Sequence, residues 1–296
     1  MASLFDFNPL QTKGLLIISL VFMVILAAGL IIDVLCLFRG RLRGIINDRL
    51  PAIRNRPWRM EDVAWIGVVT LIAYSFMLML TTLEPRIHPA DSPAIPPQVM
   101  LLIQALIFPL SSTAVTLWFF RRRGMSIMAT LHSDGKGIGH AMRTGLLAYL
   151  GIMPVFVLTN LVSIIGLTRL GCPPEPQLTI QLILDPTAPT WFHTALIGLA
   201  IIAAPVVEEV IFRGILLPGL MQHLPAMPAI VGASLIFATV HFHLPSLLPM
   251  TVLGVGFCMA YITSGSLIAP ITMHAIFNLV NIIALQLVPA GVELPL

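Results

Sequence analysis

The sequence predicts an all-α fold, a polytopic transmembrane helix bundle of about eight spans. Of the 296 residues, 57% are hydrophobic and only 10% are charged, with a mean hydropathy of +0.96. A soluble domain is about one quarter charged residues. Several uncharged stretches also reach the roughly 20 residues that a helix needs to cross a hydrocarbon core about 30 Å thick. The length therefore leaves no room for a large water-soluble domain.

Charged residues, prolines and glycines bound the apolar runs that we expect to span the membrane. The expected spans are 14–38, 63–83, 99–120, 144–168, 191–217, 226–243, 247–263 and 267–288. The first run follows no basic segment and no small-residue cleavage site, so it is expected to be a retained span and not a signal peptide.

Basic residues predict the orientation of the spans. Seven arginines fall in 39–62 and five arginines or lysines in 121–143, whereas 84–98 and 169–190 hold one basic residue each. Beside membrane spans, such clusters mark cytoplasmic loops and do not indicate a nucleic-acid partner. Both termini are then expected outside. Short loops and a small chain favour a multi-pass protein of a bacterial plasma membrane, with membrane lipid as its surroundings.

Three charged side chains stand in one expected span, in the segment AAPVVEEVIFRGILL. Between Thr187 and Pro289 the only acidic or basic residues are Glu208, Glu209 and Arg213. Each costs at least about 2.5 to 3.5 kcal/mol at membrane depth, so their presence requires a reason. Glu209 and Arg213 are four residues apart and can pair, while Glu208 is rotated by roughly 100° and is left free for proton transfer. Pro205 removes a helical hydrogen bond just before them. A buried ion-pair cluster that fixes helix register is the alternative.

Two further spans add polar pairs at helical spacing. Phe237 and His241 share one face of their helix, and His274 and Asn278 share one face of theirs. Glu208 lies about 15 residues before a turn near Gln222 to Pro225, and His241 lies about 16 residues after that turn, so an antiparallel hairpin places them at one depth. His274, on the last span, is expected at a similar depth in the membrane.

These residues resemble the three motifs of the CAAX-protease and bacteriocin-processing family, also called the Abi family, which includes the Ras-converting prenyl-protein endopeptidases. EEVIFRG is similar to EExxxR, FATVH to FxxxH and HAIFN to HxxxN. The resemblance covers about residues 140–288, a CAAX-protease-like intramembrane core, and leaves 1–120 as an N-terminal transmembrane region of unknown role.

The resemblance implies an intramembrane endopeptidase that hydrolyses peptide bonds of membrane-associated substrates with a glutamate-activated water. Glu208 would be the general base, helped by His241. His274 and Asn278 would stabilise the oxyanion, and Glu209 and Arg213 would hold the base in place. The substrate would be a peptide or protein, with or without a lipid anchor. No cofactor or metal is expected.

Other functions stay open. The chain could be a catalytically silent membrane protein of the same fold that binds a peptide or protein partner. A zinc metalloprotease is disfavoured because HExxH is absent. An ion transporter is disfavoured because the sequence has no internal repeat. His243 has no role in the motifs and is expected to lie at the membrane interface.

Overall fold

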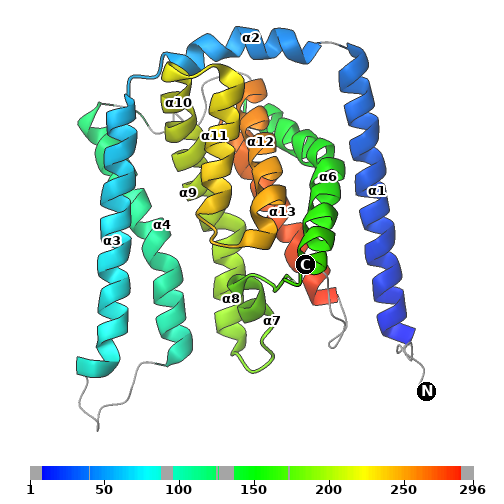
Figure 1. Ribbon diagram of the computed structural model, residues 1–296, viewed down its shortest axis with the longest axis vertical. Helices are drawn as coiled ribbons and strands as arrows, with labels where there is room; N and C mark the ends of the chain where they lie inside the picture. Colours follow the sequence, from blue (N-terminus) through cyan, green and yellow to red (C-terminus); the bar gives the residue numbers. More distant parts are fainter. Residues whose placement is uncertain are drawn as a thin grey trace.

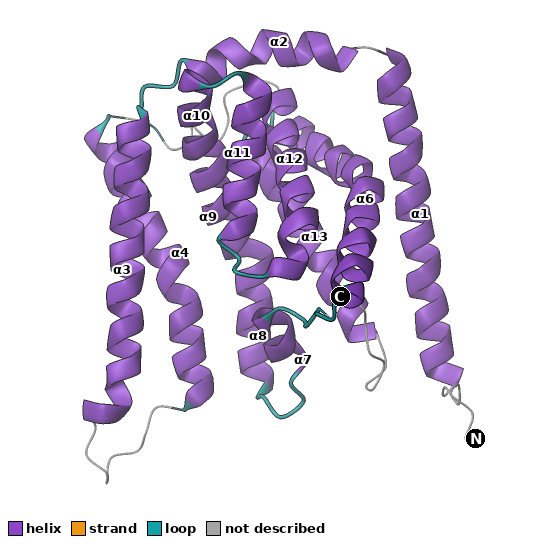
Figure 2. Cartoon of the chain, viewed as in Figure 1, coloured by secondary structure: helices purple, strands orange, loops and turns teal. Residues whose placement is uncertain are grey.

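The computed structural model describes residues 9–39, 41–87, 96–124, 126, 137–172 and 174–287. Every regular element among these residues is a helix (Figure 2). The all-α fold predicted from hydropathy is thus confirmed for the described part of the chain.

The N-terminal half holds long helices at the sides of the bundle. They are α1 (Pro9–Arg39), α2 (Arg41–Arg54), α3 (Met60–Ile87) and α4 (Pro97–Arg122). Helix α1 packs against α6 (Ile138–Arg169), and α3 packs against α4. Helix α2 lies across one end of the molecule and joins α1 to α3 (Figure 1). We call this end of the molecule the α2 end.

The C-terminal half forms the centre of the bundle. After α6 come α7 (Leu178–Leu184) and a continuous helical run of α8 (Thr190–Gly198), the π-helix η1 (Leu199–Ala203), α9 (Ala204–Glu209), the π-helix η2 (Val210–Leu216) and α10 (Leu217–His223). The chain ends with α11 (Ala226–Thr239), the 3₁₀ turn η3 (Leu244–Ser246), α12 (Leu247–Ser264) and α13 (Ile268–Leu287).

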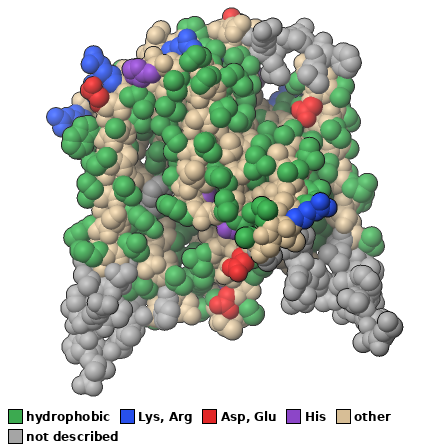
Figure 3. Space-filling model, viewed as in Figure 1, with side chains coloured by type: hydrophobic (Ala, Val, Ile, Leu, Met, Phe, Trp, Pro, Cys, Tyr) green, Lys and Arg blue, Asp and Glu red, His purple; other side chains and the backbone are tan. Residues whose placement is uncertain are grey.

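All eight expected spans coincide with helical segments. Six described segments are long and apolar enough to cross a membrane, namely Leu16–Cys36, Gln98–Arg122, Ile138–Arg169, Thr190–His223, Leu244–Ser264 and Ile268–Leu287. Ala226–Thr239 is a shorter apolar helix. Large apolar side chains on the outer faces of α1, α3 and α6 are exposed, as lipid-facing side chains should be (Figure 3).

Two boundaries differ from the sequence expectation. The segment 39–62 was expected to be a loop, but it contains α2, where Ile46, Leu50 and Ile53 recur at helical spacing and pack on the core. The span expected to end at residue 243 ends at Thr239, so its helix is only 14 residues long.

Small residues let the central helices approach closely. A Cβ atom on Gly145 of α6 would lie 2.3 Å from the Ala269 carbonyl oxygen of α13. A Cβ atom on Gly254 of α12 would lie 2.9 Å from the Ser234 Cβ of α11. Glycine at both points allows the backbone contact that drives helix association in lipid.

Candidate active site

The two glutamates lie in a helix whose hydrogen-bonding pattern is irregular. Helix α9, which carries Glu208 and Glu209, is flanked by the two π-helices η1 and η2. At the first of them the Ala204 N–H donates to Leu199 O, a spacing of five residues. π-helical turns of this kind are frequently found at functional sites.

Pro205 and η1 together free one backbone carbonyl. The Ala204 N–H, four residues after Ala200, bonds to Leu199, and Pro205, five residues after Ala200, has no N–H. Nδ2 of Asn278, on α13, donates to the Ala200 oxygen at 2.7 Å. This contact joins α13 to η1. It also fixes the amide orientation, because a carbonyl oxygen can only accept.

Glu209 is the anchor of a buried ionic cluster. Its Oε1 accepts a hydrogen bond from Nη1 of Arg213 at 2.9 Å and another from Nδ1 of His274 at 2.9 Å. The Glu209 and Arg213 side chains are fully buried. The pair expected from the four-residue spacing is present, and it holds the His274 ring with Nε2 directed away from Glu209.

Aromatic rings enclose the guanidinium of Arg213. Its Cζ lies 4.5 Å from the Phe237 ring centroid and 4.7 Å from that of Phe257. Nη2 also donates to the Gly254 carbonyl at 3.2 Å. Phe257 stacks on the His274 ring at 4.7 Å and 23°. Cation–π contacts and hydrogen bonds thus compensate for removing this charge from water.

Glu208 has a different environment from its neighbour. Its side chain is 19% exposed, and its Oε2 lies 3.9 Å from Nε2 of His274. That distance is too long for a hydrogen bond. Oε2 accepts no hydrogen bond from a protein group. Oε2 of Glu209 has no partner either, so the two carboxylates differ in exposure: Glu208 points away from the buried Glu209–Arg213 pair, as the rotation of about 100° suggested.

His241 lies in a turn and not within its helix. Helix α11 ends at Thr239, and His241 follows with its Nδ1–H donating to Phe237 O at 2.8 Å. Phe242 adopts a positive φ of 48°, an uncommon conformation for a bulky residue. The carbonyl fixes the proton on Nδ1 when the ring is neutral, which leaves Nε2 as an acceptor.

One cavity brings four of the six predicted site residues together. A cavity of about 620 Å³ is lined by Glu208, His241, His274 and Asn278, while Glu209 and Arg213 stand behind its wall. The described residues contain no group of three or more His, Cys, Asp or Glu side chains placed to hold a metal ion.

Several features of the site escaped the sequence analysis. Neither π-helix was expected, although Pro205 signalled a defect in the helix. The enclosure of Arg213 by Phe237 and Phe257 was also missed; Phe237 stands in the FxxxH motif, and that position was the available signal. His243 lines the cavity and bonds to the Glu175 carbonyl at 2.7 Å.

Comparison with known proteins gave one family match. Residues 189–280 match the family model described as Type II CAAX prenyl endopeptidase Rce1-like. No curated protein and no solved structure matched the chain. The matched range contains both glutamates, Arg213, the three cavity histidines and Asn278. With its apolar spans, the chain is an integral membrane protein, and its residues 189–280 are similar to the type II CAAX prenyl endopeptidase Rce1-like family.

Proposed function

We propose that the chain is an intramembrane endopeptidase in which Glu208 activates a water molecule for attack on a peptide bond of a membrane-associated substrate. The observation that carries this proposal is the contrast between the two adjacent carboxylates. Glu209 Oε1 receives two hydrogen bonds in a fully buried cluster, whereas the Glu208 side chain is partly exposed and lines the cavity.

The separation of Glu208 and His274 suits a water-mediated contact. Oε2 and Nε2 are 3.9 Å apart, which is the range in which one water can bridge two polar groups. Glu208 would take a proton from that water as it attacks the substrate carbonyl carbon. The same proton would then pass to the leaving amine, so that the carboxylate is regenerated.

Donors for the developing oxyanion come from α13. Asn278 uses one N–H on the Ala200 carbonyl and keeps a second N–H. His274, held by Glu209 at Nδ1, can offer Nε2–H when protonated. Both residues line the cavity with Glu208. A fixed amide and a fixed ring need little reorganisation during the reaction, which is the condition for effective oxyanion stabilisation.

His241 completes the proposed site from the α11 side. In the neutral ring, Nε2 is the acceptor, because Nδ1–H is bound to the Phe237 carbonyl. This nitrogen can accept the second hydrogen of the attacking water. Glu209 and Arg213 touch no substrate in this account and act as positioning residues for His274.

The proposal is tested by adding purified protein to two quenched fluorescent peptides. One peptide is farnesylated at a C-terminal CAAX-type cysteine, and the other carries no lipid. We expect the wild type to cleave at least one of them and Glu208→Gln to cleave neither, with both proteins equally folded. Equal cleavage by the two proteins would remove Glu208 from the mechanism. Binding of a peptide without cleavage by either protein would favour the silent binding protein.

A further inference from the structure

The cavity extends from the active site toward the end of the bundle that is opposite α2. Along α13 its lining forms a stripe of His274, Phe277, Asn278, Asn281, Ile282 and Leu285. The eleven steps along the helix from His274 to Leu285 correspond to about 16 Å at 1.5 Å per residue. His274 lies toward the start of α13 and Leu285 toward its end. Figure 1 shows that α13 begins near α2 and runs away from it.

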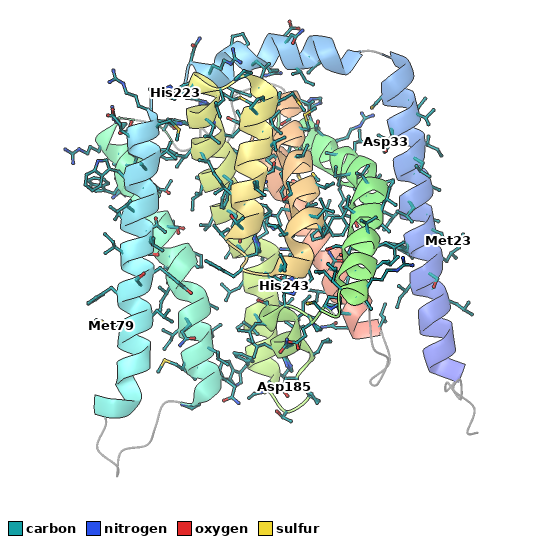
Figure 4. The ribbon with its side chains drawn as sticks, in the orientation of Figure 1. Met23, Asp33, Met79, Asp185, His223 and His243 are labelled. Carbon is teal, nitrogen blue, oxygen red and sulfur yellow. The ribbon has the colours of Figure 1, made fainter. Side chains whose placement is uncertain are left out.

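Loop residues line the far part of this cavity. They come from the segment before α7, including Gln177, and from the bend between α11 and α12, including His243 and Ser246. Among the described lining residues, none comes from α2 or from the connections 222–226 and 264–267. Figure 4 shows His223 close to α2, with His243 and Asp185 successively farther from it.

The short length of α11 places irregular backbone within the membrane. Its 14 residues extend about 21 Å, less than a hydrocarbon core about 30 Å thick. The following bend therefore lies at membrane depth. Non-helical backbone is tolerated at such depth where it lines a cavity that admits water or is covered by protein.

Polar contacts hold this bend against the segment before α7. Nε2–H of His243 donates to the Glu175 carbonyl at 2.7 Å, and the Ser246 hydroxyl lies 2.7 Å from His243 Nδ1. Gln177 Nε2 donates to Ser246 Oγ at 3.1 Å. We call His243, Ser246, Gln177 and the Glu175 carbonyl the cavity rim. A polar rim at the end of an apolar bundle is expected where water can enter a cavity.

The opposite end of the bundle carries the positive charge. Exposed arginines there include Arg54, Arg59, Arg122, Arg123 and Arg143. The charged side chains that the structure describes near the rim are Arg169, Glu175 and Asp185. Figure 3 shows most of the visible blue side chains toward the α2 end, whereas red ones lie in both the upper and the lower half. By the positive-inside rule, the α2 end faces the cytoplasm.

We propose that the active-site cavity opens to the extracytoplasmic side of the membrane, through the rim formed by His243, Ser246, Gln177 and the Glu175 carbonyl. The assignment of a substrate rests on the proposed endopeptidase function. That substrate is a peptide segment presented at the extracytoplasmic leaflet, and not the C-terminus of a cytoplasmic lipidated protein. Free N–H and C=O groups of an entering strand would meet the amides of Gln177, Asn278 and Asn281 along its path.

Cysteine labelling of the full chain tests the opening without relying on activity. Cys172 is exposed beside the rim end of α6, and Cys258 is fully buried. Four proteins are treated with a membrane-impermeant maleimide in right-side-out spheroplasts. The first carries Cys36→Ser alone and reports on Cys172. The other three carry Cys36→Ser and Cys172→Ser together with one new cysteine, at Ser246→Cys, Thr179→Cys or His223→Cys. Thr179 is a second cavity position, in case Ser246→Cys does not fold.

We expect Cys172, Ser246→Cys and Thr179→Cys to react in intact spheroplasts, and His223→Cys to react only after permeabilisation. Labelling of Cys172 only after permeabilisation would overturn the assigned orientation. If Ser246→Cys and Thr179→Cys both fold but react only after permeabilisation, as His223→Cys does, the cavity opens at the α2 end.

Cleavage of an acylated, quenched fluorescent peptide distinguishes the proposed side of the opening from the proposed peptidase activity. Added outside sealed right-side-out vesicles, the peptide should be cleaved there and not in inverted vesicles. Cleavage only in inverted vesicles would overturn the extracytoplasmic opening and leave the peptidase standing. If the solubilised protein also fails to cleave peptides, the peptidase proposal fails, and the labelling pattern alone decides the side of the opening.

Discussion

At the scale of single residues, the site separates two chemically identical side chains by their surroundings. Glu209 faces Arg213 and His274 inside the protein, whereas Glu208 faces the cavity. Helical spacing in the sequence was enough to predict this division, because a rotation of about 100° sends adjacent side chains in different directions. The sequence did not predict the bond from His274 to Glu209, because that contact joins residues on two separate spans.

Neutralising each glutamate should therefore have different consequences. Glu209→Gln leaves Arg213 buried without its counter-charge, and we expect a loss of about 3 to 5 kcal/mol of stability. Glu208→Gln should unfold close to the wild-type temperature. Thermal unfolding in detergent measures both variants. Equal destabilisation of the two would contradict the division of roles.

Asn278 should have a catalytic role in addition to its structural one. Removing an oxyanion donor lowers kcat by roughly 100-fold to 1,000-fold, so Asn278→Ala should show that loss per folded molecule. It should also cost about 1 to 3 kcal/mol of stability, because the Ala200 carbonyl loses its partner. Thr272→Val, on α13 outside the cavity lining, is the matched control. An unchanged kcat per folded molecule would restrict Asn278 to packing.

At the scale of elements, the sequence predicted helices well and their defects poorly. Eight apolar runs located the helices, since each run reflects the thickness of the membrane. The π-helix η1 is bonded through the Ala200 carbonyl to Asn278 on another span, and a single segment does not contain that contact. The early end of α11 is followed by the positive φ of Phe242, and no hydropathy pattern reveals either feature.

The close contact between α11 and α12 gives a test at this scale. Gly254→Ala would place its Cβ 2.9 Å from Ser234 Cβ, so we expect a loss of about 1 to 3 kcal/mol from overpacking. The shift should also disturb Arg213, which bonds to the Gly254 carbonyl. Gly232→Ala on α11 is the matched control, because its nearest neighbour would be Leu220 Cδ1 at 3.8 Å. Similar unfolding temperatures for the two variants would refute the close-packing account.

At the scale of the whole molecule, the arrangement combines a lipid-facing exterior with a polar cavity near its centre. Helices α6, α11, α12 and α13 pack tightly around the cluster, and α2 covers one end (Figure 1). Hydropathy and arginine placement predicted the spans and an orientation from the sequence. The cavity and its rim could not be predicted, because they require the segment before α7 and the α11–α12 bend to meet across the fold.

The most direct test of the central claim compares membranes from cells that produce the wild type with membranes that contain an equal amount of folded Glu208→Gln. Peptide termini in each membrane proteome are measured by mass spectrometry. We expect new termini, within or beside the apolar segments of membrane-anchored proteins, only where Glu208 is intact. An identical set of termini in both membranes would contradict the assignment of Glu208 as the group that activates water.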